Sequence, residues 1–244
     1  MRIISIFVSV FLFADLSEAL NFRKVAEFPM GAMATKPFGF DTDHDGNQNL
    51  ILSAVNSELP IYFFEHIGYD YYTLEDSVMW SYLCDVGYLD VDSLVDMVGN
   101  INGLWPYPIY VYASPTYYSN PINIVWQDSM FEHIGGGYIT DLDQDGLKEI
   151  LFGYTPIGTG GWRTCVYENI GDNQYSLVWQ DTTYAIWSAI SGDFDLDGQT
   201  EFIATCSGSS GWVWVWECVG DNHYQVVFQD TLPRGNNYDV FFRP

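Results

Sequence analysis

A segment of about 50 residues recurs along this chain, and this repeat limits the possible folds more than any other sequence feature. An aspartate followed by serine or threonine marks the end of each copy, at Asp76, Asp128, Asp181 and Asp230. Each copy divides into four short runs rich in Val, Ile, Trp, Tyr and Phe, separated by Gly, Asn, Asp and Ser. In the last copy these runs are 185–190, 201–206, 211–219 and 224–230.

Four short strands per repeat are typical of a propeller blade. The sequence therefore predicts an all-β fold, a β-propeller of four-stranded antiparallel blades, with about four blades encoded and an incomplete ring. A β-sandwich is the alternative, but it does not explain why one four-run unit returns four times. The predicted blades span 30–77, 78–129, 130–182 and 183–231.

Two single strands are predicted outside these blades. The run 22–28 is typical of a last strand from an earlier blade, and the run 236–242 is typical of a first strand. Unpaired strand edges favour association with other chains. We therefore expect either self-association through these edges or further blades supplied by a partner.

An acidic loop between the first and second run of each copy is the most specific motif. It reads D-x-D-x-D-G-x-x-[DE], with acids at positions 1, 3, 5 and 9 and glycine at position 6. Carboxylates at alternate positions converge when the backbone coils around a point, and such an all-oxygen ligand set suits calcium. The predicted calcium ligands are Asp41, Asp43, Asp45, Asn47 and Asn49; Asp90, Asp92 and Asp96; Asp141, Asp143, Asp145, Leu147 (through its backbone carbonyl) and Glu149; and Asp193, Asp195, Asp197, Gln199 and Glu201.

The four loops are not equally complete. The second has Tyr88 at position 1 and Ser93 at position 6, so we expect weak or absent calcium binding there. The first has Asn49 at position 9, which predicts a modestly lower affinity. An EF-hand does not fit, because position 12 is not glutamate and strands, not helices, flank the loops. Loops that are merely solvated remain the alternative for any single copy.

This motif between two strands, repeated about every 50 residues over roughly 22–240, resembles the FG-GAP/VCBS repeat family, which includes the propellers of integrin α subunits. The resemblance implies a calcium-binding propeller. It also implies calcium ligation by the acids of the third and fourth loops, and by Asp41, Asp43, Asp45 and Asn49 of the first.

Charge and the N-terminus restrict the setting. The chain has 32 acidic and 8 basic residues, a formal net charge of −24, which argues against nucleic acid as a partner. Residues 1–19 read as a secretory signal peptide, whose apolar run is too short to span a bilayer of about 30 Å. We therefore expect a secreted protein, extracellular or at the cell surface, with the periplasm also possible, and no transmembrane segment. Cys206 and Cys218 flank a predicted hairpin, where they can lie close together or remain buried free thiols.

These features predict a non-catalytic scaffold for binding or adhesion to a protein or glycan partner. Trp105, Trp162 and Trp212 fall on the rim opposite the metal loops, where they can stack on sugars or pack between blades. The alternative function is a polysaccharide lyase or hydrolase, or a lectin, on the same fold. No G-x-S-x-G, HExxH or Cys/His catalytic motif is present, so catalysis is not expected.

Overall fold

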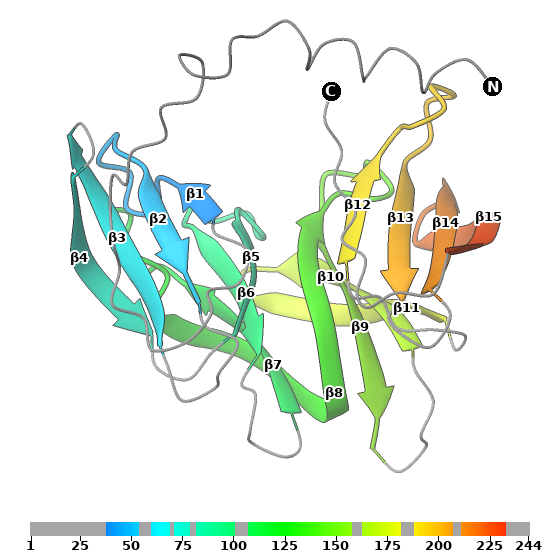
Figure 1. Cartoon of the computed structure of the whole chain (residues 1–244), viewed down its shortest axis with the longest axis horizontal. Helices are drawn as coiled ribbons and strands as arrows, with labels where there is room; N and C mark the ends of the chain where they lie inside the picture. Colours follow the sequence, from blue (N-terminus) through cyan, green and yellow to red (C-terminus); the bar gives the residue numbers. More distant parts are fainter. Residues whose placement is uncertain are drawn as a thin grey trace, which may run out of the picture.

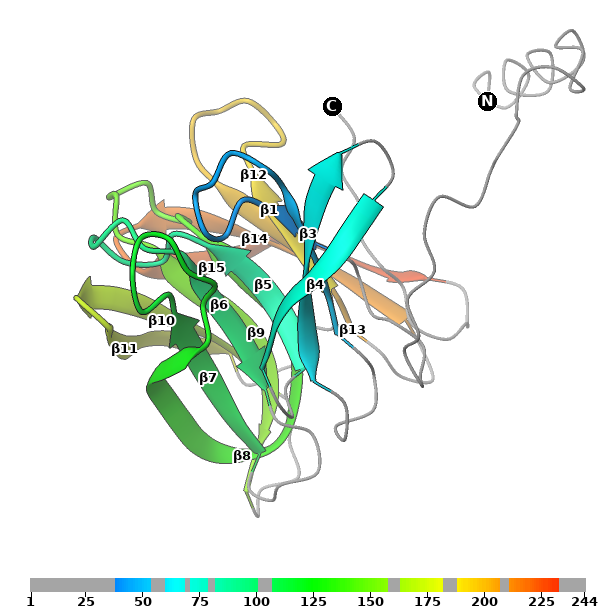
Figure 2. The same ribbon diagram turned by 90° about the vertical axis from the view of Figure 1, so that its left-hand side faces the viewer.

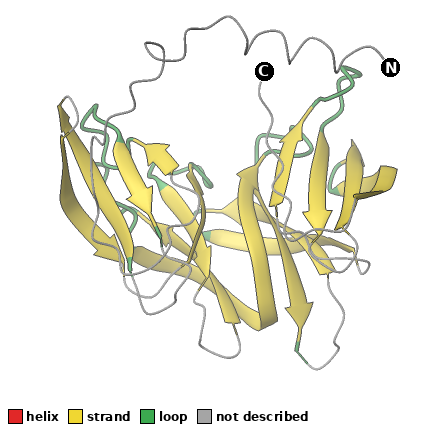
Figure 3. Cartoon of the chain, in the orientation of Figure 1, coloured by secondary structure: helices red, strands yellow, loops and turns green. Residues whose placement is uncertain are grey.

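The structure is a computed structural model that describes residues 38–53, 60–68, 71–78, 82–100, 107–157, 163–181, 188–206 and 211–232. The regular secondary structure within these ranges is β-strand throughout (Figure 3), which confirms the all-β prediction. The strands are β1 (Phe38–Phe40), β2 (Asn49–Leu52), β3 (Ile61–Gly68), β4 (Tyr71–Val78), β5 (Tyr82–Gly87), β6 (Asp96–Asn100), β7 (Tyr107–Ala113), β8 (Asn123–Thr140), β9 (Glu149–Pro156), β10 (Arg163–Gly171), β11 (Gln174–Asp181), β12 (Ser188–Gly192), β13 (Glu201–Cys206), β14 (Gly211–Gly220) and β15 (His223–Leu232). The predicted signal peptide, the strands predicted at 22–28 and 236–242, and Trp105 and Trp162 lie outside the described residues.

The strands form four antiparallel four-stranded units in sequence order (Figure 1). The first unit is β1–β4, the second β5–β8, the third β8–β11 and the fourth β12–β15. The second and third units share β8, an 18-residue strand, and so make one seven-stranded sheet. The second predicted repeat ends at residue 129, whereas β8 continues through this point to Thr140.

A β-bulge recurs at one position in all four units. The register between the third and fourth strands shifts after Phe63, Val111, Val166 and Val215. A bulge increases the local right-handed twist of a strand pair. Repetition of this irregularity shows that the four units share one backbone geometry and not only a strand count.

The core lies between neighbouring units, where the apolar faces of their sheets pack together. Each of its three clusters takes buried residues from two consecutive units. Between the third and fourth units, for example, Leu151 and Val166 pack with Phe202 and Trp216, and the last two rings stack at 4.9 Å between centroids. Sheets packed face to face in sequence are consistent with a blade arrangement.

The units follow one another along an arc rather than a closed ring in the part of the chain that the structure describes (Figures 1 and 2). No described helix is long and apolar enough to cross a membrane.

Strand register keeps Cys206 and Cys218 apart. Cys206 lies opposite Trp212 in the β13–β14 pair, whereas the Cys218 amide bonds to the Thr200 carbonyl beyond the other end of β13. Six residues of strand separate the two ends, about 20 Å at ~3.4 Å per residue, and a disulfide requires Cα atoms within about 7 Å. Of the alternatives left open by the sequence, close approach of these two cysteines is therefore wrong. Cys165 and Cys218 are buried free thiols, and Cys84 is also buried.

Candidate metal centre

One hydrogen bond closes all four acidic loops. The backbone N–H of position 2 donates to a side-chain oxygen of position 9, which is the first residue of the unit's second strand. The N···O distances are 2.8 Å for Thr42–Asn49, 2.9 Å for Leu89–Asp96, 2.6 Å for Leu142–Glu149 and 2.7 Å for Phe194–Glu201. The position-9 side chain therefore fixes the start of the loop against the start of the strand that follows it.

A second repeated bond shapes the far side of each loop. The N–H of position 7 donates to the carboxylate of position 5, at 2.7 Å in the first three loops and 2.8 Å in the fourth. Position 6 has a positive φ in every loop, at Gly46, Gly146 and Gly198 and also at Ser93. The second loop thus makes the same turn without glycine, although its position 4 lacks the positive φ of His44, Gln144 and Leu196.

These bonds gather the predicted acids. In the third loop, Asp141, Asp143, Asp145 and Glu149 each place an oxygen within 4.8 Å of the others. The corresponding four acids of the fourth loop, Asp193, Asp195, Asp197 and Glu201, do the same, and so do Asp41, Asp43 and Asp45 in the first loop. These sets could hold a metal ion.

Several of these carboxylates have a buried oxygen without a hydrogen-bond partner. Glu149 is fully buried; its Oε2 accepts the Leu142 amide, whereas its Oε1 has no partner. Glu201 Oε1, Asp41 Oδ1 and Asp141 Oδ1 are also buried and unpaired. A buried carboxylate oxygen without a partner is costly. A cation among these oxygens would satisfy them, and the all-oxygen donor set fits calcium.

The electrostatics of the third and fourth loops agree with this interpretation. Burial, and then the neighbouring Asp143 and Asp141, raise the pKa of Glu149 to about 8. The pKa of Glu201 is raised for the same reason, first by burial and then by the acids of its own loop. Lys148 lies 3.4 Å from Asp141 and offsets part of the negative charge of the third loop.

Asn49 in the first loop already uses its amide group for structural bonds. Its Oδ1 accepts from the backbone N–H and hydroxyl of Thr42, at 2.8 and 2.7 Å, and its Nδ2 donates to Glu65 and Glu75. Glu65 lies opposite Asn49 in the β2–β3 pair. Its Oε1 is buried and unpaired, and burial together with Asp45 and Asp43 raises its pKa to about 7. Acids hold the equivalent place in the third and fourth units, where Glu168 lies opposite Glu149 and Glu217 lies opposite Glu201, so this acid is part of the repeat.

Sequence reasoning did not find Glu65, nor two further acids in turns between third and fourth strands. Asp172, in the β10–β11 turn, joins Asp90 and Asp92 of the second loop in one cluster. Asp221, in the β14–β15 turn, joins Asp143 and Glu168. The available signal was the repeated Gly-Asp-Asn turn at 171–173 and 220–222.

These turns rest on the loop of the preceding unit. The Asn173 amide donates to Asp90 Oδ2 at 2.8 Å, and the Asn222 amide donates to Asp143 Oδ2 at 3.0 Å. Between the first two units, Thr42 bonds to Asn120 in the longer β7–β8 loop. The metal loops and the turns between third and fourth strands thus lie on one side of the molecule, as the alternating strand directions predict.

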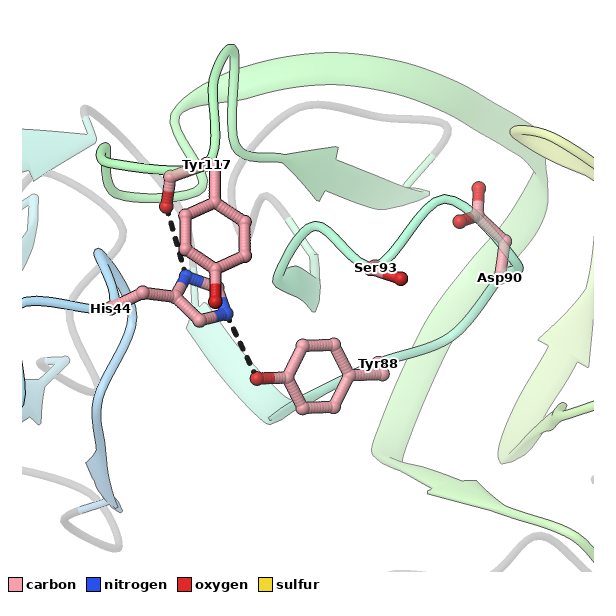
Figure 4. Close-up of a pocket in the computed structure, with 5 residues that line it drawn as sticks. All are labelled: His44, Tyr88, Asp90, Ser93 and Tyr117. Carbon is pink, nitrogen blue, oxygen red and sulfur yellow. Dashed lines mark hydrogen bonds between the residues drawn. The ribbon is translucent and has the colours of Figure 1, made fainter.

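A cavity of about 280 Å³ opens between the first two loops (Figure 4). His44 lines the cavity between two tyrosines, with Nδ1 at 2.9 Å from the Tyr117 carbonyl and Nε2 at 2.9 Å from the Tyr88 hydroxyl. Asp90 and Ser93 complete the lining. This cavity is on the same side of the molecule as the acidic loops.

Trp212 is the one described member of the three tryptophans predicted to bind ligand. It is partly buried and packs against the core cluster between the third and fourth units, with its ring 6.2 Å from that of Trp214. This environment agrees with the packing role that the sequence left open. Its role in ligand binding stays a prediction.

No protein-family model matches the chain, and no curated protein matches it. Among solved structures, the crystal structure of the V. cholerae biofilm matrix protein Bap1 is similar, with 13% sequence identity and a TM-score of 0.32. The match covers 74% of this chain and 35% of that chain, so this chain spans about a third of its length. A likeness of this size does not assign the chain to a family.

Proposed function

We propose that this chain is a secreted, calcium-binding β-propeller segment of the FG-GAP/VCBS type that serves as a non-catalytic scaffold for binding or adhesion. The observation that carries the proposal is the common geometry of the four loops. Each has its position-9 side chain anchored to position 2, and its acids converge around buried, unpaired carboxylate oxygens. Mere solvation of acidic turns gives no reason for this repeated burial.

In this function calcium is structural. Without a cation, three or four carboxylates repel one another in each loop. A site that sees calcium at about ten times its Kd gains roughly 1.4 kcal/mol, so three such sites add on the order of 4 kcal/mol. That is a large share of a typical domain stability of about 5–15 kcal/mol. Extracellular modules bind calcium with Kd values of about 10⁻⁴–10⁻³ M, which fits the predicted location.

A protein or glycan would be the partner. The cavity near His44 combines the rings of Tyr88 and Tyr117 with the polar groups of Asp90 and Ser93. Aromatic rings beside hydrogen-bonding groups suit ligands with both apolar and polar surface. A partner would therefore bind at this cavity or, as the sequence predicts, at the opposite rim near Trp212.

Calcium titration of the mature chain by calorimetry, with thermal melting in calcium and in EDTA, tests the proposal. Two or more saturable sites are expected, with a melting temperature raised by calcium and hardly by magnesium. Asp143→Asn should remove or weaken one site. The control Asp230→Asn, an exposed acid in β15 away from the loops, should leave all sites intact. Absence of saturable binding together with absence of an EDTA effect would refute the proposal.

A glycan array and a screen of extracellular proteins, each run with calcium and with EDTA, address the scaffold role. Binding that is lost in EDTA and weakened by Tyr117→Ala supports a partner at the cavity. Turnover of a glycan that continues after the metal loops are disabled would favour an enzyme instead.

A further inference from the structure

Tyr88 stands where the other three loops begin with aspartate, and the structure gives it a different task. Its hydroxyl bonds to His44 Nε2 at 2.9 Å, and its ring contacts Phe40 edge-on at 5.7 Å between centroids. Both partners belong to the first unit. Tyr88 therefore joins the first and second units and adds no carboxylate to its own loop.

The third unit supplies a carboxylate next to this loop, as the fourth unit does next to the third loop with Asp221. Asp172, in the turn between β10 and β11, has an oxygen within 4.8 Å of oxygens of Asp90 and Asp92. The turn is held there by the Asn173 amide, which donates to Asp90 Oδ2 at 2.8 Å. Three carboxylates from two units thus meet at one point.

Two buried polar groups beside this cluster have no partner. Asp96 is 1% exposed; its Oδ2 accepts the Leu89 amide at 2.9 Å, and its Oδ1 is unpaired. Tyr175 is 8% exposed, and its hydroxyl is also unpaired. Orphaned buried oxygens next to clustered negative charge indicate that a positively charged ligand belongs between them.

From this geometry we infer that a divalent cation of the calcium class binds between the second and third units, held by Asp90, Asp92 and Asp96 of one unit and Asp172 of the next. The identity of the cation rests on the proposed function. The second loop, which the sequence predicts to be degenerate, is then a site completed from outside its own repeat. Its cation joins two units, whereas the spacing of the motif predicts ligands from a single loop.

Hydrogen exchange of the full mature chain, measured by mass spectrometry across a calcium titration, tests this inference. Calcium should slow exchange in 88–96 and in 171–175 with one shared midpoint, because one ion orders both segments. Asp172→Asn should move that midpoint to about tenfold higher calcium or beyond, the size of effect common for groups that tune a metal site. Asp230→Asn removes the same charge elsewhere and should leave the midpoint in place.

A second pair of variants separates ligation from folding. Asp92→Asn should shift protection in 171–175, although this segment belongs to the other unit. Adding Tyr88→Asp to Asp172→Asn should restore part of the lost affinity by returning an acid to position 1. Melting temperatures of the single variants in EDTA that are no lower than that of the original chain show that the fold is intact.

The possible failures are distinct. If calcium protects 141–149 and 193–201 but leaves 88–96 and 171–175 unchanged, this inference is wrong and the proposed function stands. The inference is also wrong if Asp172→Asn binds with an unchanged midpoint. If no loop responds to calcium, the proposed function itself fails.

Discussion

Calcium binding to the third loop should release a proton, because the loop contains a carboxyl group that holds its proton near neutral pH. The pKa of Glu149 is raised to about 8, by burial and by Asp143, Asp141 and Asp145. At pH 7 a group with this pKa is about 0.9 protonated in the metal-free chain. A calcium ligand must be ionised, so binding should displace about this fraction of a proton, falling to about 0.1 at pH 9.

The same shift sets the sign of the pH dependence of stability without metal. The pKa of Glu149 is about 8 in the folded state and 4.5 in the unfolded chain, so the folded state holds the proton more tightly. The resulting stability is fully present below about pH 4.5 and is lost as pH rises toward 8, by about 3 kcal/mol at pH 7. Glu65 and Asp96, each with a pKa of about 7, act in the same direction. Metal-free protein should therefore weaken from pH 5 to 8, and calcium should oppose this loss.

Calorimetric titration at pH 7 in two buffers of different ionisation enthalpy measures the protons released per calcium. Glu149→Gln should remove the proton release that accompanies calcium binding to the third loop. It should also weaken calcium binding there and raise the melting temperature of the metal-free chain at pH 8. Asp230→Asn, the matched loss of an exposed acid, should change none of these quantities. Saturable calcium binding at pH 7 with no proton release would refute the reasoning.

Two further predictions concern the backbone. Gly146→Ala should destabilise the chain by about 1–2 kcal/mol in urea unfolding, because residue 146 has a φ of 92° and the added Cβ would meet no atom within 4 Å that could compensate. Gly220→Ala, also in open space but without a positive φ, should have almost no effect. Peptide mapping without reduction should find Cys206 and Cys218 unlinked, and a peptide joining them would contradict the register of β13 and β14.

The strands that could be predicted are those whose pattern is local. The run 201–206 is β13 without adjustment, and the run 211–219 differs from β14 by one residue. The continuity of β8 was not predictable, because its glycines at 135–137 indicate a break in the sequence. In the structure β8 pairs with β7 on one side and β9 on the other, and register shifts after Phe131 and Ile134 accommodate the irregular stretch. Pairing with β9 on both sides of the glycine stretch, at 131–134 and 137–140, overrides the local signal.

The acids within each loop could be predicted, because one turn of backbone brings positions 1, 3, 5 and 9 together. Glu65 and Asp172 could not, because their positions depend on pairing and packing beyond the loop. Glu65 reaches the first loop across a strand pair, and the turn of Asp172 bonds to Asp90 over a separation of 83 residues. The repeated Gly-Asp-Asn turn was visible in the sequence, but its place over the preceding loop follows only from how the units stack.

Each departure from the loop motif keeps a structural bond. Where position 9 is Asn49, its amide oxygen still accepts the Thr42 amide. Where position 1 is Tyr88, its hydroxyl bonds to His44 of the neighbouring unit. The acids outside the loops do not replace the missing ones, because they also stand beside complete loops: Glu168 and Glu217 lie opposite Glu149 and Glu201 as Glu65 lies opposite Asn49, and Asp221 lies beside Asp143 as Asp172 lies beside Asp90. These acids are therefore part of the repeat, and they add negative charge that a cation of the proposed kind would offset.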